Sequence, residues 1–501
     1  MITLSMAVLV PLTSAVCLAA TPEQPPRRPN IIVIVADDLG WNSVSYHGGP
    51  IRTPHIDRLA RDGVAMDRFY VSPMCSPTRA GLMTGRYPMR FGMARSVVRP
   101  WMARGLPPEE QTLAEALAQA GYRHRGVFGK WHLGHLGPQW HPLSRGFTEF
   151  VGQYNGAADY WTRDRNGEID WHVNATPQQP KGYTTHLITD AAADFIRKHA
   201  KEGPFFCYVP YTAPHDPLQA PDEYVARYAH LDDDPADGKP SDFQTLAAMI
   251  TCMDDGIGKL LETVETAGIR DNTLVWFFSD NGGVRRFGDV NTPLREGKLT
   301  VYEGGVRVPA VVWWPGVIDG GRTIRAPMVN CDVAPTLLRA AGGKPATDKP
   351  LDGIDALDVL TGRADALPPR DLFMFNGQSG AEREQAAIIA ADGWKLVVIG
   401  PDIRGPKGFE TRRHVVELFH LADDPFEKHD LAAEHPQRVA ELGRRLIAFR
   451  ASEPADSMAP ENRPPAGFKP PAQWRNAPIG QPAPAGPKRQ NSQPETKEEQ
   501  P

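Results

Sequence analysis

The chain has 501 residues, of which 41% are hydrophobic, and a formal net charge of −5 from 55 Lys and Arg against 60 Asp and Glu. This length allows two to four domains, and the near balance of charge excludes the basic face that a nucleic-acid-binding protein needs. Five cysteines in so long a chain exclude a small disulfide-stapled scaffold. The composition therefore favours a globular enzyme.

The first 20 residues, MITLSMAVLVPLTSAVCLAA, are small and apolar, and residues 21–29 are polar and rich in proline. This pattern is typical of a secretory signal peptide over residues 1–20. A transmembrane anchor is disfavoured by Pro11 and by the short apolar length, and lipid modification of Cys17 by the large Val16 before it. No later segment has the roughly 20 consecutive apolar residues that span a bilayer. We expect a periplasmic or secreted protein without stable membrane insertion.

Apolar runs without polar alternation alternate with helical patterns along the first two thirds of the chain. Such runs are typical of strands buried on both faces. In chain order we expect a strand at 31–36, helices at 53–63 and 111–121, a short strand at 125–128, a strand at 205–209, a helix at 243–267 and a strand at 273–278. The alternation predicts an α/β catalytic domain over residues 29–365, with a large, mainly parallel sheet flanked by helices.

The pattern changes after about residue 345. Residues 392–399 and 417–421 are typical of strands in a short antiparallel sheet, and 436–449 of a helix. We expect a smaller C-terminal subdomain over residues 366–450. From residue 451 to 501 Pro, Ala, Gly, Gln and charged residues predominate, which predicts a largely disordered tail. Within it, Phe468 and Trp474 offer apolar anchors to the body of the protein.

The sharpest local feature is the segment Cys75-Ser-Pro-Thr-Arg79, which continues as Ala-Gly-Leu-Met-Thr-Gly-Arg-Tyr-Pro. A buried cysteine ahead of a Pro-led helix would account for Cys75 alone. The whole stretch resembles the signature of the type I sulfatase family. That resemblance implies an alkaline-phosphatase-like sandwich, and oxidation of Cys75 to formylglycine by a formylglycine-generating enzyme before folding. One oxygen of the hydrated aldehyde would attack sulfur, and the other would later expel sulfate.

Two pairs of polar residues directly follow predicted strands. Asp37 and Asp38 follow the strand at 31–36, and Asp280 and Asn281 follow the strand at 273–278. Each pair alone would suit a turn. Together, at the strand ends where open α/β sheets bind ligands, they favour a hard cation such as Ca²⁺ or Mg²⁺ over Zn²⁺. The family resemblance implies a single Ca²⁺ at these four residues, with a formylglycine oxygen from position 75 completing its ligands.

Other charged residues have roles that only the resemblance implies. Lys130 and His132 lie two apart, so they face the same side of an extended segment. By resemblance Lys130 holds a sulfate oxygen, His132 holds the formylglycine diol, and His215 protonates or clamps the leaving-group oxygen. Lys298 would neutralise the bridging ester oxygen. Arg79 would bind the formylglycine hydroxyl and keep the nucleophile acidic.

The segment from Gly121 to Lys130 departs from the family pattern by one additional residue. A slip of one residue within a strand would turn its side chains to the opposite face. We expect the extra residue to be absorbed in the turn before Val127, which leaves Lys130 and His132 in place.

The predicted activity is hydrolysis of a sulfate ester, which makes the protein a sulfuric ester hydrolase. The substrate would be an aryl sulfate or a sulfated glycan, because residues 37–48 and 51–57 look closest to the arylsulfatase B, or N-acetylgalactosamine 4-sulfatase, branch. Loops at 97–105, 153–172 and 404–413, rich in Arg, Trp and His, are expected to line the pocket. The alternatives are a phosphonate monoester or phosphodiester hydrolase of the same superfamily, and a catalytically silent glycan-binding relative.

Overall fold

Strand β1 (Asn30–Ala36) lies at the centre of the main sheet, because all seven of its residues, NIIVIVA, are buried. It pairs in parallel with β10 (Phe205–Pro210) on one side and with β11 (Thr273–Ser279) on the other. The computed structural model describes residues 28–345, 347–401, 403, 409 and 413–475. The predicted signal peptide and residues 476–501 lie outside these described residues.

The main sheet has ten strands in the order β13-β2-β12-β11-β1-β10-β4-β5-β8-β9. Its five central strands, β11 to β5, run in parallel, and β12 and β8 turn antiparallel beyond them. The mixed, mainly parallel sheet predicted from the sequence is thereby confirmed. The remaining strands of this sheet are β2 (Val64–Met66), β4 (His124–Lys130), β5 (Glu149–Gln153), β8 (His172–Val173), β9 (Thr176–Pro177), β12 (Ala310–Trp313) and β13 (Arg322–Ile324).

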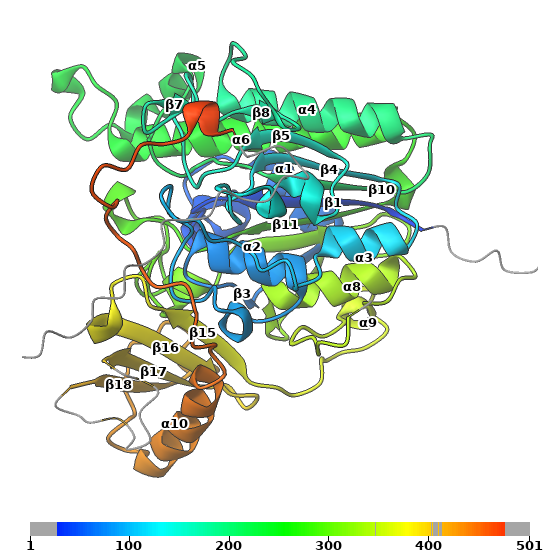
Figure 1. The fold of residues 1–501 in the computed structure, drawn as a ribbon. Coiled ribbons are helices and arrows are strands. Elements are labelled where there is room, and N and C mark those ends of the chain that lie inside the picture. The colour runs from blue at the N-terminus through cyan, green and yellow to red at the C-terminus, as the bar shows by residue number, and fades with distance from the viewer. Residues whose placement is uncertain (1–27, 346, 402, 404–408, 410–412, 476–501) are drawn as a thin grey trace, which may run out of the picture.

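Helices cover both faces of this sheet (Figure 1). Alternate residues of β1 point to opposite faces, so Val33 belongs to one hydrophobic cluster and Ile34 to the other. The first face packs against α2 (Cys75–Thr84), α3 (Leu113–Gln119), α8 (Val333–Ala340) and α9 (Leu357–Leu360). The second face packs against α1 (Pro54–Asp62), α4 (Thr184–His199), α5 (Asp222–Val225) and α6 (Asp242–Thr266).

A second, four-stranded antiparallel sheet follows, as expected for the C-terminal part of the chain. It consists of β15 (Leu372–Asn376), β16 (Glu384–Ile389), β17 (Trp394–Gly400) and β18 (Val415–His420), and α10 (Pro436–Arg450) packs on it. Lys395 of β17 joins this sheet to the main body: its Nζ lies 2.9 Å from Glu303 Oε1, in α7 (Glu303–Val306), and 2.8 Å from Glu427 Oε1. All three side chains are buried, so the contact fixes one sheet against the other.

Residues 451–475, which we call the C-terminal strap, differ from the predicted disordered tail. The strap runs from the end of α10 along the main body to its far side (Figure 1). The Met458 amide donates to Gly92 O at 2.9 Å, and Phe468 packs edge-on against Trp101. Trp474 is fully buried and donates from Nε1 to Arg165 O at 2.9 Å. The two anchors seen in the sequence hold this segment, although its composition resembles that of an unfolded chain.

Over the described residues, no helix is both long and apolar enough to cross a membrane.

Candidate active site

The carboxyl ends of β1, β10 and β11 bring the predicted strand-end residues to one edge of the sheet. The Asp37 amide donates to Ala213 O at 3.0 Å, and the Asp280 amide donates to Ala36 O at 2.9 Å. The second bond continues the pairing of β1 and β11 by one residue, and the first joins the end of β1 to the loop that follows β10. They place Asp37, Asp280 and the loop that carries His215 side by side.

Helix α2 presents Cys75 to the same edge. Cys75 is its first residue, and its Sγ lies 3.6 Å from Asp37 Oδ1. Arg79 lies one turn further along, so its side chain shares that face of the helix. Its Nε and Nη2 donate to Asp280 Oδ2 at 2.9 and 2.7 Å, and its Nη1 donates to Lys130 O at 2.8 Å. All ten residues of α2 are buried, which holds Cys75 rigidly.

Two lysines neutralise the two adjacent aspartates. Lys130, the last residue of β4, pairs with Asp37, and neither side chain is exposed to solvent. Lys298 pairs with Asp38. Arg79 pairs with Asp280 in the same way. These six side chains form what we call the floor of the site, which holds three carboxylates and three cationic groups.

Side chains that can bind a metal ion gather at this edge of the sheet. Ligand atoms of Asp37, Asp38, Cys75 and His215 all lie within 4.8 Å of one another. Asn281 donates from Nδ2 to Asp38 Oδ1 at 2.7 Å, while its own Oδ1 is buried and has no hydrogen-bond partner among the described residues. A buried carbonyl oxygen without a partner is costly, and a cation would satisfy it.

Burial and neighbouring charges set the protonation of the floor. Burial, reinforced by Asp280, raises the pKa of Asp37 to about 7. The pKa of Asp38 is lowered instead. Burial raises it, but the charges of Lys298 and His215 outweigh the effect of burial. Burial raises the pKa of the Cys75 thiol to about 12, so the unmodified thiol is protonated at neutral pH.

The two histidines face the space above this floor. His132 Nε2 lies 3.0 Å from Val98 O, and its Nδ1 is buried with no partner in the described part of the chain. Burial and nearby Lys130 hold the pKa of His132 well below its usual range. Burial and Lys298 lower the pKa of His215 to about 4, and its Nδ1 lies 2.6 Å from Asp216 O. Both rings are therefore neutral at neutral pH.

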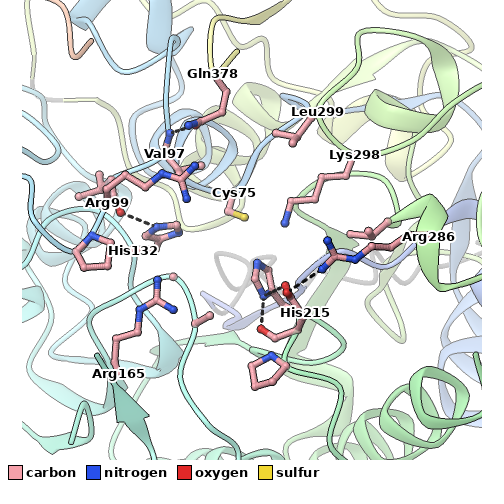
Figure 2. A pocket seen from close by; sticks show the side chains of 17 residues that line it. Cys75, Val97, Arg99, His132, Arg165, His215, Arg286, Lys298, Leu299 and Gln378 are labelled. Carbon is pink, nitrogen blue, oxygen red and sulfur yellow. Dashed lines mark hydrogen bonds and ion pairs between the residues drawn. The ribbon is translucent and has the colours of Figure 1, made fainter. Parts of the chain in front are cut away.

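A cavity of about 530 Å³ opens above these groups (Figure 2). Four residues predicted from the sequence line it: Cys75, His132, His215 and Lys298. The other predicted site residues lie beneath the cavity: Asp37, Asp38, Arg79, Lys130, Asp280 and Asn281. The lining also includes charged and polar residues that the sequence did not single out, namely Arg99, Arg165, Asp216, Arg286 and Gln378. The first two lie in loops that were expected to line the pocket.

Strand β4, which carries Lys130 at its end, pairs in regular register with both of its neighbours. Strand β4 pairs with β10 from His124 to Val127 and with β5 from Gly126 to Lys130 without interruption. The turn at Gly121, which has φ of +90°, precedes this strand. Both Lys130 and His132 reach the site, as expected.

This arrangement is an α/β fold with a cationic site at the carboxyl edge of a mainly parallel sheet. The family model described as "Sulfatase" matches residues 29–343, and the chain belongs to the sulfatase family. Arylsulfatase J of Mus musculus is 32% identical over 460 residues, which cover 84% of this chain and 76% of that one. N-acetylgalactosamine-6-sulfatase of Mus musculus is 33% identical over 459 residues, which cover 84% of this chain and 85% of that one. The protein is therefore a sulfuric ester hydrolase.

Solved structures share the alkaline-phosphatase-like fold. Ps i-CgsB in complex with k-i-k-neocarrahexaose has a TM-score of 0.77 and 31% identity over 87% of this chain and 96% of that one. Phosphonate monoester hydrolase of Agrobacterium radiobacter has a TM-score of 0.60 and 20% identity over 85% and 96%. The second likeness concerns the fold alone, so the sulfatase interpretation stands over the phosphonate alternative.

Proposed function

We propose that this protein is an exported, cation-dependent sulfatase of sulfated glycans whose nucleophile derives from Cys75. The observation that carries the proposal is the convergence of Lys298, His132 and His215 around Cys75 at the base of one cavity. A sulfate ester is an anion that gains charge on its leaving oxygen during cleavage. Preorganised cationic and hydrogen-bonding groups are the usual means of stabilising such charge.

Asp37, Asp38, Asp280 and Asn281 would hold the cation, which we propose to be Ca²⁺. Its donors are carboxylate and amide oxygens, which Ca²⁺ prefers. Bound there, the cation would supply positive charge that lowers the pKa of a neighbouring hydroxyl and polarises the ester. The unpartnered Oδ1 of Asn281 supports this assignment.

Modification of Cys75 to formylglycine would supply an oxygen nucleophile and a second oxygen for release of sulfate. The environment of Cys75 supports a need for such a change. A thiol whose pKa burial raises to about 12 gives almost no thiolate at neutral pH, and only the thiolate is an effective nucleophile. The modifying partner would be a formylglycine-generating enzyme.

The chain's own residues would divide the remaining work. Arg79, fixed by Asp280, would orient the nucleophile at position 75, and Lys130 would add charge from below. Lys298 would bind the sulfate at the cavity wall, while His132 would hold the nucleophile from the other side. His215 is neutral in the free protein, but an anion beside it raises the pKa of an imidazole, so a bound ester would favour protonation of this leaving-group acid.

The substrate class is supported by the cavity and by the relatives. A volume of about 530 Å³ suits one or two sugar rings, since ligand sites commonly measure about 300 to 1,000 Å³. Relatives are named for N-acetylgalactosamine 6-sulfate, and a related structure binds a carrageenan oligosaccharide. We propose a periplasmic or secreted location from the signal-like residues 1–20.

The test compares turnover of p-nitrophenyl sulfate with that of a p-nitrophenyl phosphonate ester. The protein is produced together with a formylglycine-generating enzyme, and Cys75→Ala serves as the control. We expect faster sulfate release, its loss in Cys75→Ala, and a mass change at the Cys75 peptide. Faster phosphonate release would favour the alternative hydrolase, and unchanged sulfate release in Cys75→Ala would overturn the role of this residue.

A further inference from the structure

Two arginines, Arg99 and Arg165, line the cavity without a carboxylate partner. Arg165 belongs to the hairpin of β6 (Asp164–Arg165) and β7 (Glu168–Ile169), whereas Arg99 lies in the loop that follows α2. In Figure 2 they flank His132, on the side of the cavity opposite Lys298 and Arg286. The Nε atoms of both are buried and have no hydrogen-bond partner within the described residues.

Elsewhere in the described chain, buried arginines such as Arg79 and Arg163 have a partner for at least one guanidinium nitrogen, even though the Nε of Arg163 has none. Arg79 and Arg370 are paired with buried aspartates. Arg125 and Arg163 instead donate to backbone carbonyl oxygens. Arg165 does neither: over the described chain its guanidinium has no hydrogen bond and no ion pair within 4.0 Å.

Neither arginine has a carboxylate within ion-pair distance among the described residues. The one side-chain bond of the Arg99 guanidinium runs from Nη2 to Asn462 Oδ1 at 3.3 Å, a neutral acceptor. Burial lowers the pKa of both arginines; for Arg165, the charge of Asp170 partly offsets this effect and the charge of Arg99 adds to it. Two adjacent, partly desolvated cations are unfavourable unless an anion joins them.

The C-terminal strap holds both arginine-bearing segments. Asn462 contacts Arg99 and also donates to Gln378 O at 2.8 Å, while Trp474 donates to the backbone of Arg165. Trp101, two residues from Arg99, donates from Nε1 to Glu461 O at 2.9 Å. The strap thus holds the two segments that carry these arginines before any ligand arrives, which favours binding.

We propose that Arg99 and Arg165 form a second anion subsite, which selects glycans that carry another anionic group close to the sulfate ester being cleaved. The inference rests on the proposed function, because it assumes that the ester itself lies over Cys75, beside Lys298. Guanidinium groups bind sulfate and carboxylate alike, through paired hydrogen bonds. The second group is therefore a sulfate on the same sugar or the carboxylate of a neighbouring uronic acid.

The test measures binding by calorimetry in the Cys75→Ala background, which keeps the probes intact. The probes are N-acetylgalactosamine 6-sulfate, N-acetylgalactosamine 4,6-disulfate, and a disaccharide of an unsaturated uronic acid and N-acetylgalactosamine 6-sulfate. We expect at least one dianionic probe to bind about tenfold more tightly than the monosulfate, as charged hydrogen bonds of this kind allow. The probe that gains identifies the second group as sulfate or carboxylate.

Added Arg99→Gln and Arg165→Gln substitutions should abolish that gain and leave the affinity for the monosulfate within about twofold. Arg165→Lys, which keeps the charge without the paired donors, should restore part of it. Arg227→Gln, an exposed position outside the cavity lining, controls for the loss of net charge, and thermal unfolding confirms that each variant is folded. The proposal is overturned if neither dianion binds more tightly than the monosulfate, or if the substitutions weaken all probes equally.

Failure of the subsite can be told apart from failure of the proposed function. Turnover of p-nitrophenyl sulfate, which has a single anionic group, tests the chemistry alone. Arg99→Gln and Arg165→Gln should weaken binding of the dianion by a larger factor than they raise the KM for this ester. An active enzyme with no preference for dianions would refute the subsite and retain the sulfatase.

Discussion

Lys298 Nζ lies 2.7 Å from both carboxylate oxygens of Asp38, although the two residues are 260 positions apart in the chain. Lys298 lines the substrate cavity, whereas Asp38 belongs to the proposed cation site beneath it. One ion pair therefore connects the two halves of the site. A cation that binds Asp38 competes with Lys298 for its charge and makes the lysine more available to a sulfate.

Calcium should stabilise the folded protein. A cation that binds only the native state adds about 2.7 kcal/mol at one hundred times its Kd. We expect the thermal unfolding temperature to rise with Ca²⁺ and to fall with a chelator. Asn281→Ala, which removes the unpartnered oxygen, should shrink this shift. Equal shifts in the two proteins would contradict the proposed ligand set.

Loss of the Arg79 side chain should destabilise the fold more than loss of an exposed arginine. Arg79→Gln leaves Asp280 charged and buried, which typically costs about 3–5 kcal/mol. Arg197, whose pair with Asp194 is exposed, should cost less than about 1 kcal/mol when changed to Gln. Urea unfolding measures both. A similar cost for the two substitutions would mean that the buried pair adds nothing to stability.

The central strands were predictable because their apolar runs reflect burial on both faces. The runs at 31–36, 205–209 and 273–278 correspond to β1, β10 and β11 to within a residue or two. Their ends in turn predicted which acidic residues meet at the sheet edge. The helix expected at 111–121 is shorter, Leu113–Gln119, because Thr112 caps it through Oγ1, which accepts from the Glu115 amide.

Features that depend on contacts between distant segments were not predictable. The last two strands at one end of the main sheet, β8 and β9, have two residues each, too few for a periodic pattern. The strap has the composition of a disordered tail, and its order comes from the surface that it covers. Likewise, Arg165 resembles any loop arginine until the fold places it in the cavity beside Arg99.

Gly156 should be required for the position of His132. A Cβ at residue 156 would lie 2.4 Å from His132 Cε1, so Gly156→Ala has to displace the ring. Misplacement of a catalytic group by about 1 Å can cost about 100-fold in rate. We expect a loss of that order in kcat/KM for p-nitrophenyl sulfate.

Gly137→Ala is the matched control for this substitution. The three atoms nearest to the added Cβ all belong to the carboxamide of Gln139, the flexible end of a side chain that can move aside. Its activity should stay near that of the unchanged protein. Equal activity of the Gly156 and Gly137 variants would show that the His132 ring tolerates displacement.

Acid should destabilise the protein through His141. The Leu143 amide donates to its Nδ1 at 3.1 Å, so Nε2 carries the proton and donates to Tyr154 Oη at 2.8 Å. Burial lowers the pKa of His141 from 6.5 to about 4, because the charged form has neither solvent nor an acceptor at Nδ1. At a pH between these two values, His141 binds a proton in the unfolded chain but not in the folded protein.

The sign of this effect follows from linkage. The contribution of His141 is complete above pH 6.5 and is lost as the pH falls toward 4, by up to about 3 kcal/mol. The free energy of unfolding, measured with urea across this range, should decrease. The decrease should be smaller in His141→Phe, and an equal slope in both proteins would contradict the assignment.

The complete burial of α2 bears on when Cys75 can be modified. Strand β1 finds both of its neighbours only after β10 and β11 have been synthesised. At about 5–20 residues per second, the roughly 200 residues between Cys75 and the end of β11 take about 10–40 s to emerge. If Cys75 is converted as proposed, the long-range topology would leave the modifying enzyme that interval in which to reach Cys75 on an unfinished chain, and a circular permutant that begins with β11 would shorten it.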